Sequence, residues 1–95
     1  MNFKFTINEV ITIVMAMLEQ LESINEFGVE NEVYFPKPIN DKLNSIEDEE
    51  YDKFISKAYE IAYKVYFLKS GELNELNFIH EEVNSLAQEL LKEYI

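Results

Sequence analysis

The fold of this chain is indicated most clearly by residues 6–28, TINEVITIVMAMLEQLESINEFG. Thr6 and Glu9 have the spacing of a capping box, in which the hydroxyl and the carboxylate each satisfy an unpaired backbone N–H group at the start of a helix. Gly28 can adopt the left-handed conformation that ends many helices. The sequence therefore predicts a helix that begins directly after Thr6 and ends within residues 25–27.

The apolar residues of this first helix are spread widely around its axis. At about 100° per residue they cover roughly 200° of the helix circumference. Such an arc is too wide for one contact face. We therefore expect this helix to lie at the centre of the fold or to contact a second molecule.

Two further helices are predicted downstream. One has Ser45 as its N-cap and acidic residues in its first turn, where the helix dipole favours anions, and it ends at about Lys69, with Gly71 beyond the end. Its apolar arc is also wide, about 220°. The other runs from about Glu75 to Tyr94, and its apolar stripe of about 140° has the ordinary width for a helix that lies on a core.

The segment that connects the first two helices contains Pro36 and Pro38, so extended chain is predicted there. Ile39 and Leu43 are expected to attach this segment to the core. A short helix over 39–44 is the alternative.

Two short segments have a strand pattern. Residues near 2–6 and 32–35 alternate between apolar and polar side chains, and we predict that they pair as a two-stranded β ribbon. Residues 1–95 are expected to form a single helical domain. Its fold class is mainly α, a small bundle of three helices, or of four if the short helix over 39–44 forms.

The composition excludes several classes of site. There is no cysteine, which excludes disulfides, thiolate zinc sites and cysteine nucleophiles. The 19 acidic residues outnumber eight basic ones, all lysine, and the formal net charge is −11. A chain of this charge repels nucleic acid and anionic lipid but attracts a basic protein surface. The alternative is that the charge only keeps the protein soluble.

No targeting segment or membrane span is visible in the sequence. Residues 10–18 are nearly all apolar, but this run is far shorter than the roughly 20 residues that a transmembrane helix needs. We therefore expect a soluble cytoplasmic protein.

No residue pattern points to catalysis. His80, the only histidine, lies at the edge of the apolar stripe of the third helix, and Glu81 and Glu82 do not share its helix face. The acidic residues 47–50 lack the alternating ligands and central glycine of a calcium loop, and a negatively charged helix start explains them. We therefore expect no enzymatic activity, no cofactor and no metal site.

A row of tyrosines is the first candidate for a binding surface. Tyr59, Tyr63 and Tyr66 follow the i, i+4, i+7 spacing of one helix face. A tyrosine ring buries a large area while its hydroxyl still needs a partner, which suits an interface. The row is therefore a candidate surface for a partner protein or a pocket for a small ligand. The alternatives are a core or the seam of a homodimer.

A row of glutamates on the third helix is the second candidate. Seven-residue spacing places Glu75, Glu82 and Glu89 about 10 Å apart on one side, with Glu93 beyond them. Such a row can stand in for a phosphate backbone and occupy a basic groove. Phe78 falls on the same polar side and is a candidate interface anchor. The alternative is an ordinary solvated face.

In size and acidity the chain is similar to the small acidic inhibitors that phages and mobile elements make against nucleic-acid-handling proteins. We therefore predict a non-catalytic acidic module, an inhibitor or nucleic-acid mimic, that occupies a basic surface of such a protein. The expected partner is a basic-surfaced protein, with no direct binding to nucleic acid or membrane, and the wide apolar arcs predict a homodimer. The alternatives are a helical homo-oligomer with a scaffolding role and a protein that sequesters a small ligand in a tyrosine-lined pocket.

Overall fold

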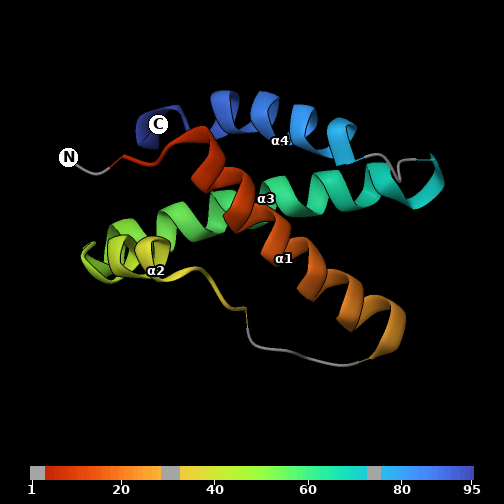
Figure 1. Cartoon of the computed structure of the whole chain (residues 1–95), viewed down its shortest axis with the longest axis horizontal. Helices are drawn as coiled ribbons and strands as arrows, with labels where there is room; N and C mark the ends of the chain where they lie inside the picture. Colours follow the sequence, from red (N-terminus) through yellow and green to blue (C-terminus); the bar gives the residue numbers. More distant parts are fainter. Residues whose placement is uncertain (1–3, 29–32, 73–75) are drawn as a thin grey trace.

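The computed structural model describes residues 4–28, 33–72 and 76–95, and for residues 68–72 and 76–78 it describes the backbone alone. Within these residues the chain is a bundle of helices without strands (Figure 1). This result confirms the mainly α fold class in its four-helix form. The elements are α1 (Ile7–Phe27), α2 (Lys37–Asn44), α3 (Asp48–Glu72), α4 (Leu76–Leu90) and a short 3₁₀ helix, η1 (Lys92–Tyr94).

Both ends of α1 form as predicted. The Glu9 backbone N–H donates to the Thr6 hydroxyl at 3.1 Å, and the Thr6 N–H donates to Glu9 Oε1 at 2.9 Å. At the other end Gly28 has a φ of 66°, and its N–H donates to the Ile24 carbonyl. Local hydrogen bonds therefore fix the limits of this helix.

The core lies where the three long helices meet. α1 crosses α3 and also packs against α4, and α3 packs against α4 (Figure 1). The central position of α1 explains the width of its apolar arc, because two neighbours cover it. The core residues of these three helices are Val10, Ile13, Val14, Met17, Leu18 and Leu21 on α1, Phe54, Ala58, Ile61, Ala62 and Val65 on α3, and Ile79, Val83 and Ala87 on α4.

Residues 33–36 of the connecting segment form no helix, but extended chain beyond Pro36 is the wrong prediction, and the alternative, a short helix over 39–44, is confirmed with an earlier start. α2 begins at Lys37, with Pro36 at the N-cap and Pro38 in the first turn. Proline is tolerated there because the first N–H groups of a helix have no partner within it. Ile39 and Leu43 are buried in the core, as predicted.

The predicted limits of the second long helix are also wrong. Ser45 does not cap α3; it ends α2, and its hydroxyl donates to the Lys42 carbonyl at 2.7 Å. α3 begins three residues later at Asp48 and continues through Gly71 to Glu72. The acidic residues in its first turn are present as predicted.

No β ribbon is seen in the described parts of its two segments, residues 4–6 and 33–35, and the remainder lies outside the described residues. The Phe5 N–H instead donates to the Tyr94 carbonyl at 2.6 Å, and the Phe5 ring stacks on Phe54 at 4.6 Å between centroids. Phe54 in turn meets Tyr94 edge-on at 5.3 Å. The apolar residue that suggested a strand is therefore a core residue that joins the two ends of the fold.

Candidate protein-binding surface

Charge is distributed unequally among the helices. α1 carries four glutamates and α4 carries three, and neither helix contains a lysine. The lysines lie on the other elements and near the ends of the chain: Lys4, Lys37, Lys42, Lys53, Lys57, Lys64, Lys69 and Lys92. α1 and α4 pack against each other, so the two helices without lysine are neighbours in the fold, and we call the surface that they share the α1–α4 face.

Ion pairs are found on α1, α2 and α3. They include Lys37–Asp41, Lys53–Glu49 and Lys42–Glu9. The first two are exposed i, i+4 pairs within α2 and α3, which contribute little to stability. The third involves Glu9 of α1, and within the described residues α4 makes no ion pair.

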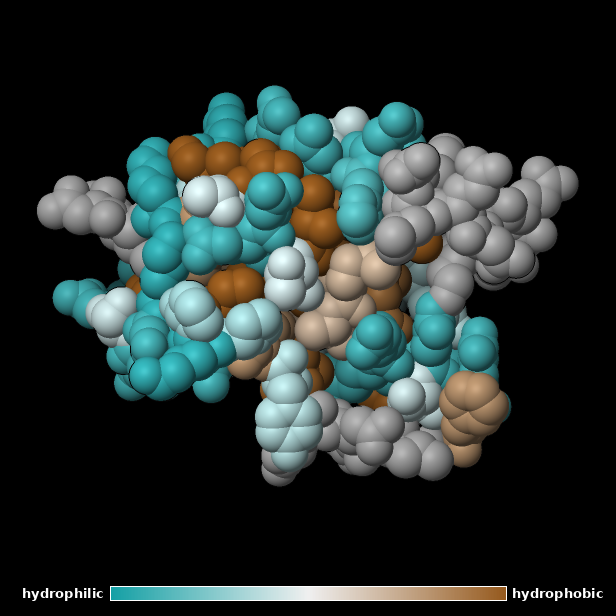
Figure 2. Space-filling model, in the orientation of Figure 1, coloured by the Kyte–Doolittle hydropathy of each residue, from teal (hydrophilic) through white to brown (hydrophobic). Residues whose placement is uncertain are grey.

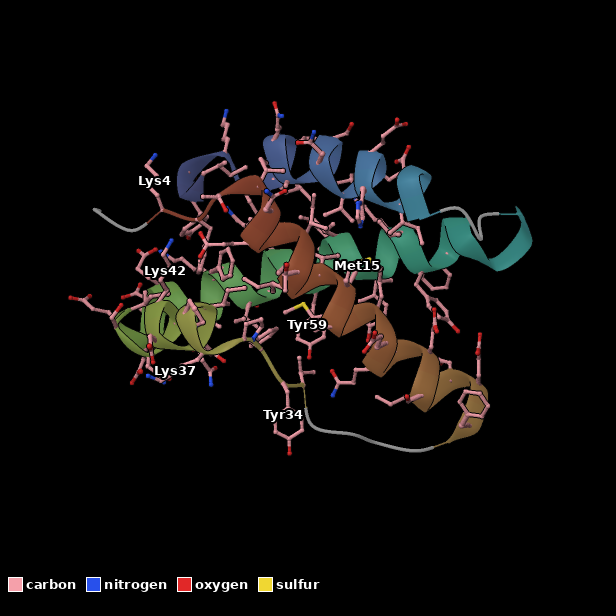
Figure 3. All side chains as sticks on the ribbon, in the orientation of Figure 1. Lys4, Met15, Tyr34, Lys37, Lys42 and Tyr59 are labelled. Carbon is pink, nitrogen blue, oxygen red and sulfur yellow. The ribbon has the colours of Figure 1, made fainter. Side chains whose placement is uncertain are left out.

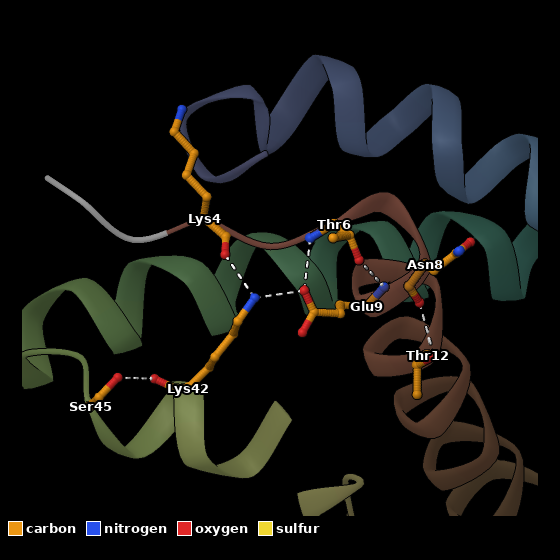
Figure 4. Close-up of polar contacts among 7 residues, drawn as sticks. All are labelled: Lys4, Thr6, Asn8, Glu9, Thr12, Lys42 and Ser45. Carbon is orange, nitrogen blue, oxygen red and sulfur yellow. Dashed lines mark hydrogen bonds and ion pairs between the residues drawn. The ribbon is translucent and has the colours of Figure 1, made fainter. Parts of the chain in front are cut away.

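Glu9 has a structural role at the edge of this surface (Figure 4). Lys42 Nζ donates to Glu9 Oε1 at 2.7 Å and to the Lys4 carbonyl at 3.1 Å, and it lies over the Phe5 ring. Burial of the carboxylate opposes its ionisation, but hydrogen bonds from Lys42 and Thr6 and the Lys42 charge outweigh burial and lower the pKa of Glu9. This carboxylate holds α2 against the start of α1.

The structure describes three of the four glutamates in the predicted row. Glu89 and Glu93 are exposed, and Glu82 is half-buried. Glu75 lies outside the described residues, and the side chain of Phe78 is not among those described. The structure thus places Glu82 and Glu89 on α4, with Glu93 following on η1.

The tyrosine row does not form one uniform surface. The Tyr59 hydroxyl donates to Gln20 Oε1 of α1 at 2.7 Å, and burial of this ring raises the pKa of Tyr59. Tyr66 is half-buried, whereas Tyr63 is 47% exposed. Tyr59 therefore helps to pack α3 against α1, and Tyr63 offers the most surface to a partner.

A groove between α1 and α4 was not predicted. It has a volume of about 490 Å³. Two signals in the sequence point towards it, namely the wide apolar arc of α1 and the position of His80 at the edge of the α4 stripe. The residues that line it are Asn8, Ile11, Thr12, Met15, Ala16, Glu19 and His80.

A second hollow of about 300 Å³ lies beside α2 and the start of α3. Its lining combines apolar side chains with asparagine amides, one carboxylate and the hydroxyl of Tyr51. Neither hollow is lined by Tyr59, Tyr63 or Tyr66. The tyrosine row therefore contributes to neither of these two cavities.

Other features bear on the class of protein. Among the residues whose side chains the structure describes, no three His, Asp or Glu side chains are grouped so that they could hold a metal ion. In the same residues no helix has the length and apolar character to cross a membrane. We compared the chain with protein-family models, curated proteins and solved structures, and none of them matches.

Proposed function

We propose that this protein is a non-catalytic binding module that docks its α1–α4 face on a basic surface of a nucleic-acid-binding protein and blocks that surface. The observation that carries the proposal is the absence of lysine from α1 and α4, while both helices carry glutamates. An acidic protein whose charge served solubility alone would not need this segregation.

The mechanism is occlusion. Carboxylates fixed on helices present negative charge at defined positions, as the phosphates of a nucleic acid do, and they attract the lysines and arginines of the partner. Attraction between opposite charges speeds the encounter at low ionic strength. Because the charges are exposed, salt screens them, with a Debye length of about 8 Å at 0.15 M and about 3 Å at 1 M.

The proposal is tested by capture of proteins from a cell lysate on the immobilised chain, at 0.05 M and 0.5 M salt, with identification of the retained proteins. We expect nucleic-acid-binding proteins to be retained at low salt and lost at high salt. Added duplex DNA should compete with the chain for these proteins, because both occupy the same basic surface.

A pair of charge-reversal variants separates a defined surface from overall charge. Glu82→Lys with Glu89→Lys changes α4, and Asp52→Lys with Glu60→Lys makes the same change in net charge at exposed positions of α3. The α4 variant should lose the captured proteins, and the α3 variant should retain them. Retention that is independent of salt, or an equal loss in both variants, would contradict the proposal.

Self-association is a second candidate function, and exposed aromatic side chains favour it. Phe27 is 73% exposed at the end of α1, and Phe67 is 70% exposed on the later part of α3. Exposed apolar patches often mark a contact surface, and these two rings are candidate members of one. Light scattering at tens of micromolar protein tests this candidate. A dimer in the parent protein that becomes a monomer in the double variant Phe27→Ser, Phe67→Ser would support self-association. A monomer in the parent protein would remove it.

A further inference from the structure

The α1–α4 groove combines an apolar floor with polar edges. Ile11, Met15 and Ala16 are partly buried and still accessible in the groove, and His80 lines it from α4. Figure 2 shows apolar atoms in tan and brown across the middle of the viewed face, between bands of hydrophilic atoms. Figure 3 places Met15 in that region, on α1 below α4. Binding of an apolar ligand group on this floor is therefore favourable, because it removes apolar surface from water.

The length of the groove favours an elongated ligand. Its lining on α1 runs from Asn8 to Glu19, which is about 16 Å at 1.5 Å per residue, or three helical turns. Ile11 and Met15 are four residues apart and therefore lie on one face of α1. An amphipathic helix that is laid into a groove makes this kind of contact, with apolar side chains at i, i+3, i+4 and i+7.

The charge around the groove determines whether the bound helix should be basic or acidic. Neither α1 nor α4 carries a lysine, and the exposed carboxylate of Glu19 lines the groove itself. A second copy of this chain, with a net charge of −11, would bring like charges together. A segment with lysines and arginines beside its apolar stripe would be attracted instead.

We propose that the α1–α4 groove binds one basic amphipathic helix of the partner protein. The apolar face of that helix covers Ile11 and Met15, and its cationic residues face Glu19. This inference rests on the proposed function and deepens it, because it states which part of the acidic face is contacted and what kind of segment contacts it.

The test uses the full chain and two synthetic peptides of 18 residues made only of lysine and leucine. One peptide has leucine at i, i+3, i+4 and i+7, and the other has the same composition in an order without an apolar face. Fluorescence anisotropy should show that the amphipathic peptide binds at least about tenfold more tightly, because only its leucines can enter the groove together.

The single histidine of the chain provides an independent readout. His80 gives the only imidazole C2–H resonance in a proton NMR spectrum, and this residue lines the groove. The amphipathic peptide should shift that resonance, and the reordered peptide should leave it unchanged. This measurement uses the unaltered protein, so it does not depend on whether a variant folds.

A matched pair of tryptophan variants locates the contact. Thr12→Trp fills the groove from an exposed position of α1, and Ser56→Trp adds the same ring at an exposed position of α3. Thr12→Trp should lower the affinity for the amphipathic peptide at least about tenfold, and Ser56→Trp should change that affinity less than about twofold.

Several results would overturn the inference: equal affinity for the two peptides, an unmoved His80 resonance, or equal effects of the two tryptophan variants. Equal binding of both peptides that still falls with salt would leave the proposed function standing and remove the groove as its site. If neither peptide binds at low salt, both proposals fail.

Discussion

Replacement of Lys42 by methionine is expected to destabilise the protein, because this lysine joins three parts of the chain. Its ammonium group donates to Glu9 Oε1 at 2.7 Å and to the Lys4 carbonyl at 3.1 Å, and lies 5.4 Å from the centre of the Phe5 ring. Methionine keeps most of the apolar stem and removes the charge and the donors. The substitution therefore isolates the polar contribution of the side chain.

The expected loss is about 1.5 kcal/mol. Hydrogen bonds to charged groups contribute about 1.5–3 kcal/mol when they are removed. The lower end applies here because the Lys42 side chain is 41% exposed and the Glu9 side chain 20% exposed, so solvent screens the pair in part. A loss of this size lowers Tm by about 6–12 °C in a domain of this length. Lys37→Met, which removes an 88% exposed lysine 4.0 Å from Asp41, should cost less than about 0.5 kcal/mol.

Urea denaturation followed by circular dichroism measures both variants, and a double-mutant cycle of Lys42→Met with Glu9→Gln measures the coupling. The pKa of Glu9 is lowered in the folded protein, so its stabilising effect is complete above the unfolded value of 4.5. The effect is lost as the pH falls through the lower folded-state pKa, and the difference in stability between the parent protein and the Glu9→Gln variant should disappear there. Equal losses for Lys42→Met and Lys37→Met would refute the reasoning.

Three further substitutions test other parts of the fold, each by chemical denaturation. Tyr94→Phe removes a 3.2 Å hydrogen bond to Glu50 and should lower the free energy of unfolding by about 1 kcal/mol. Burial and that bond raise the pKa of Tyr94, so the parent protein loses stability as the pH rises above 10, and the variant should lose less. Gly28→Ala should cost about 1 kcal/mol through its φ of 66° alone, since no atom lies within 4 Å of an added Cβ, and Gly28→Asn should cost less. Phe54→Ala, at a fully buried position between two aromatic rings, should cost about 3–5 kcal/mol, and a loss below about 1 kcal/mol would contradict the packing described.

The parts of the fold that depend on local chemistry could be predicted from the sequence. The limits of α1 follow from Thr6, Glu9 and Gly28, which bond to groups within a few residues. The start of α3 could not be found in the same way, because Ser45 is a good N-cap residue but bonds backwards to Lys42. Whether Ser45 caps α3 or ends α2 depends on the turn between these two helices, which is not set by the residue type at position 45.

The candidate site was only partly predictable for a related reason. The glutamates of α4 and the absence of lysine from two helices are visible in the sequence. The groove depends on how α1 and α4 cross, which places Met15 and His80 in one lining although the two are far apart in the chain. No local pattern encodes that crossing, because it results from the packing of all three long helices.

The bond between the Phe5 N–H and the Tyr94 carbonyl also bears on how the protein is made. A ribosome adds about 5–20 residues per second, so Tyr94 is synthesised several seconds after Phe5. During that time α1 can form, but its first turn lacks the aromatic cover that Tyr94 and Phe54 later provide. While residues 6–94 are being synthesised, a nascent chain therefore lacks part of the aromatic cover of the Phe5 ring, and chaperones that hold apolar segments have that time to bind it.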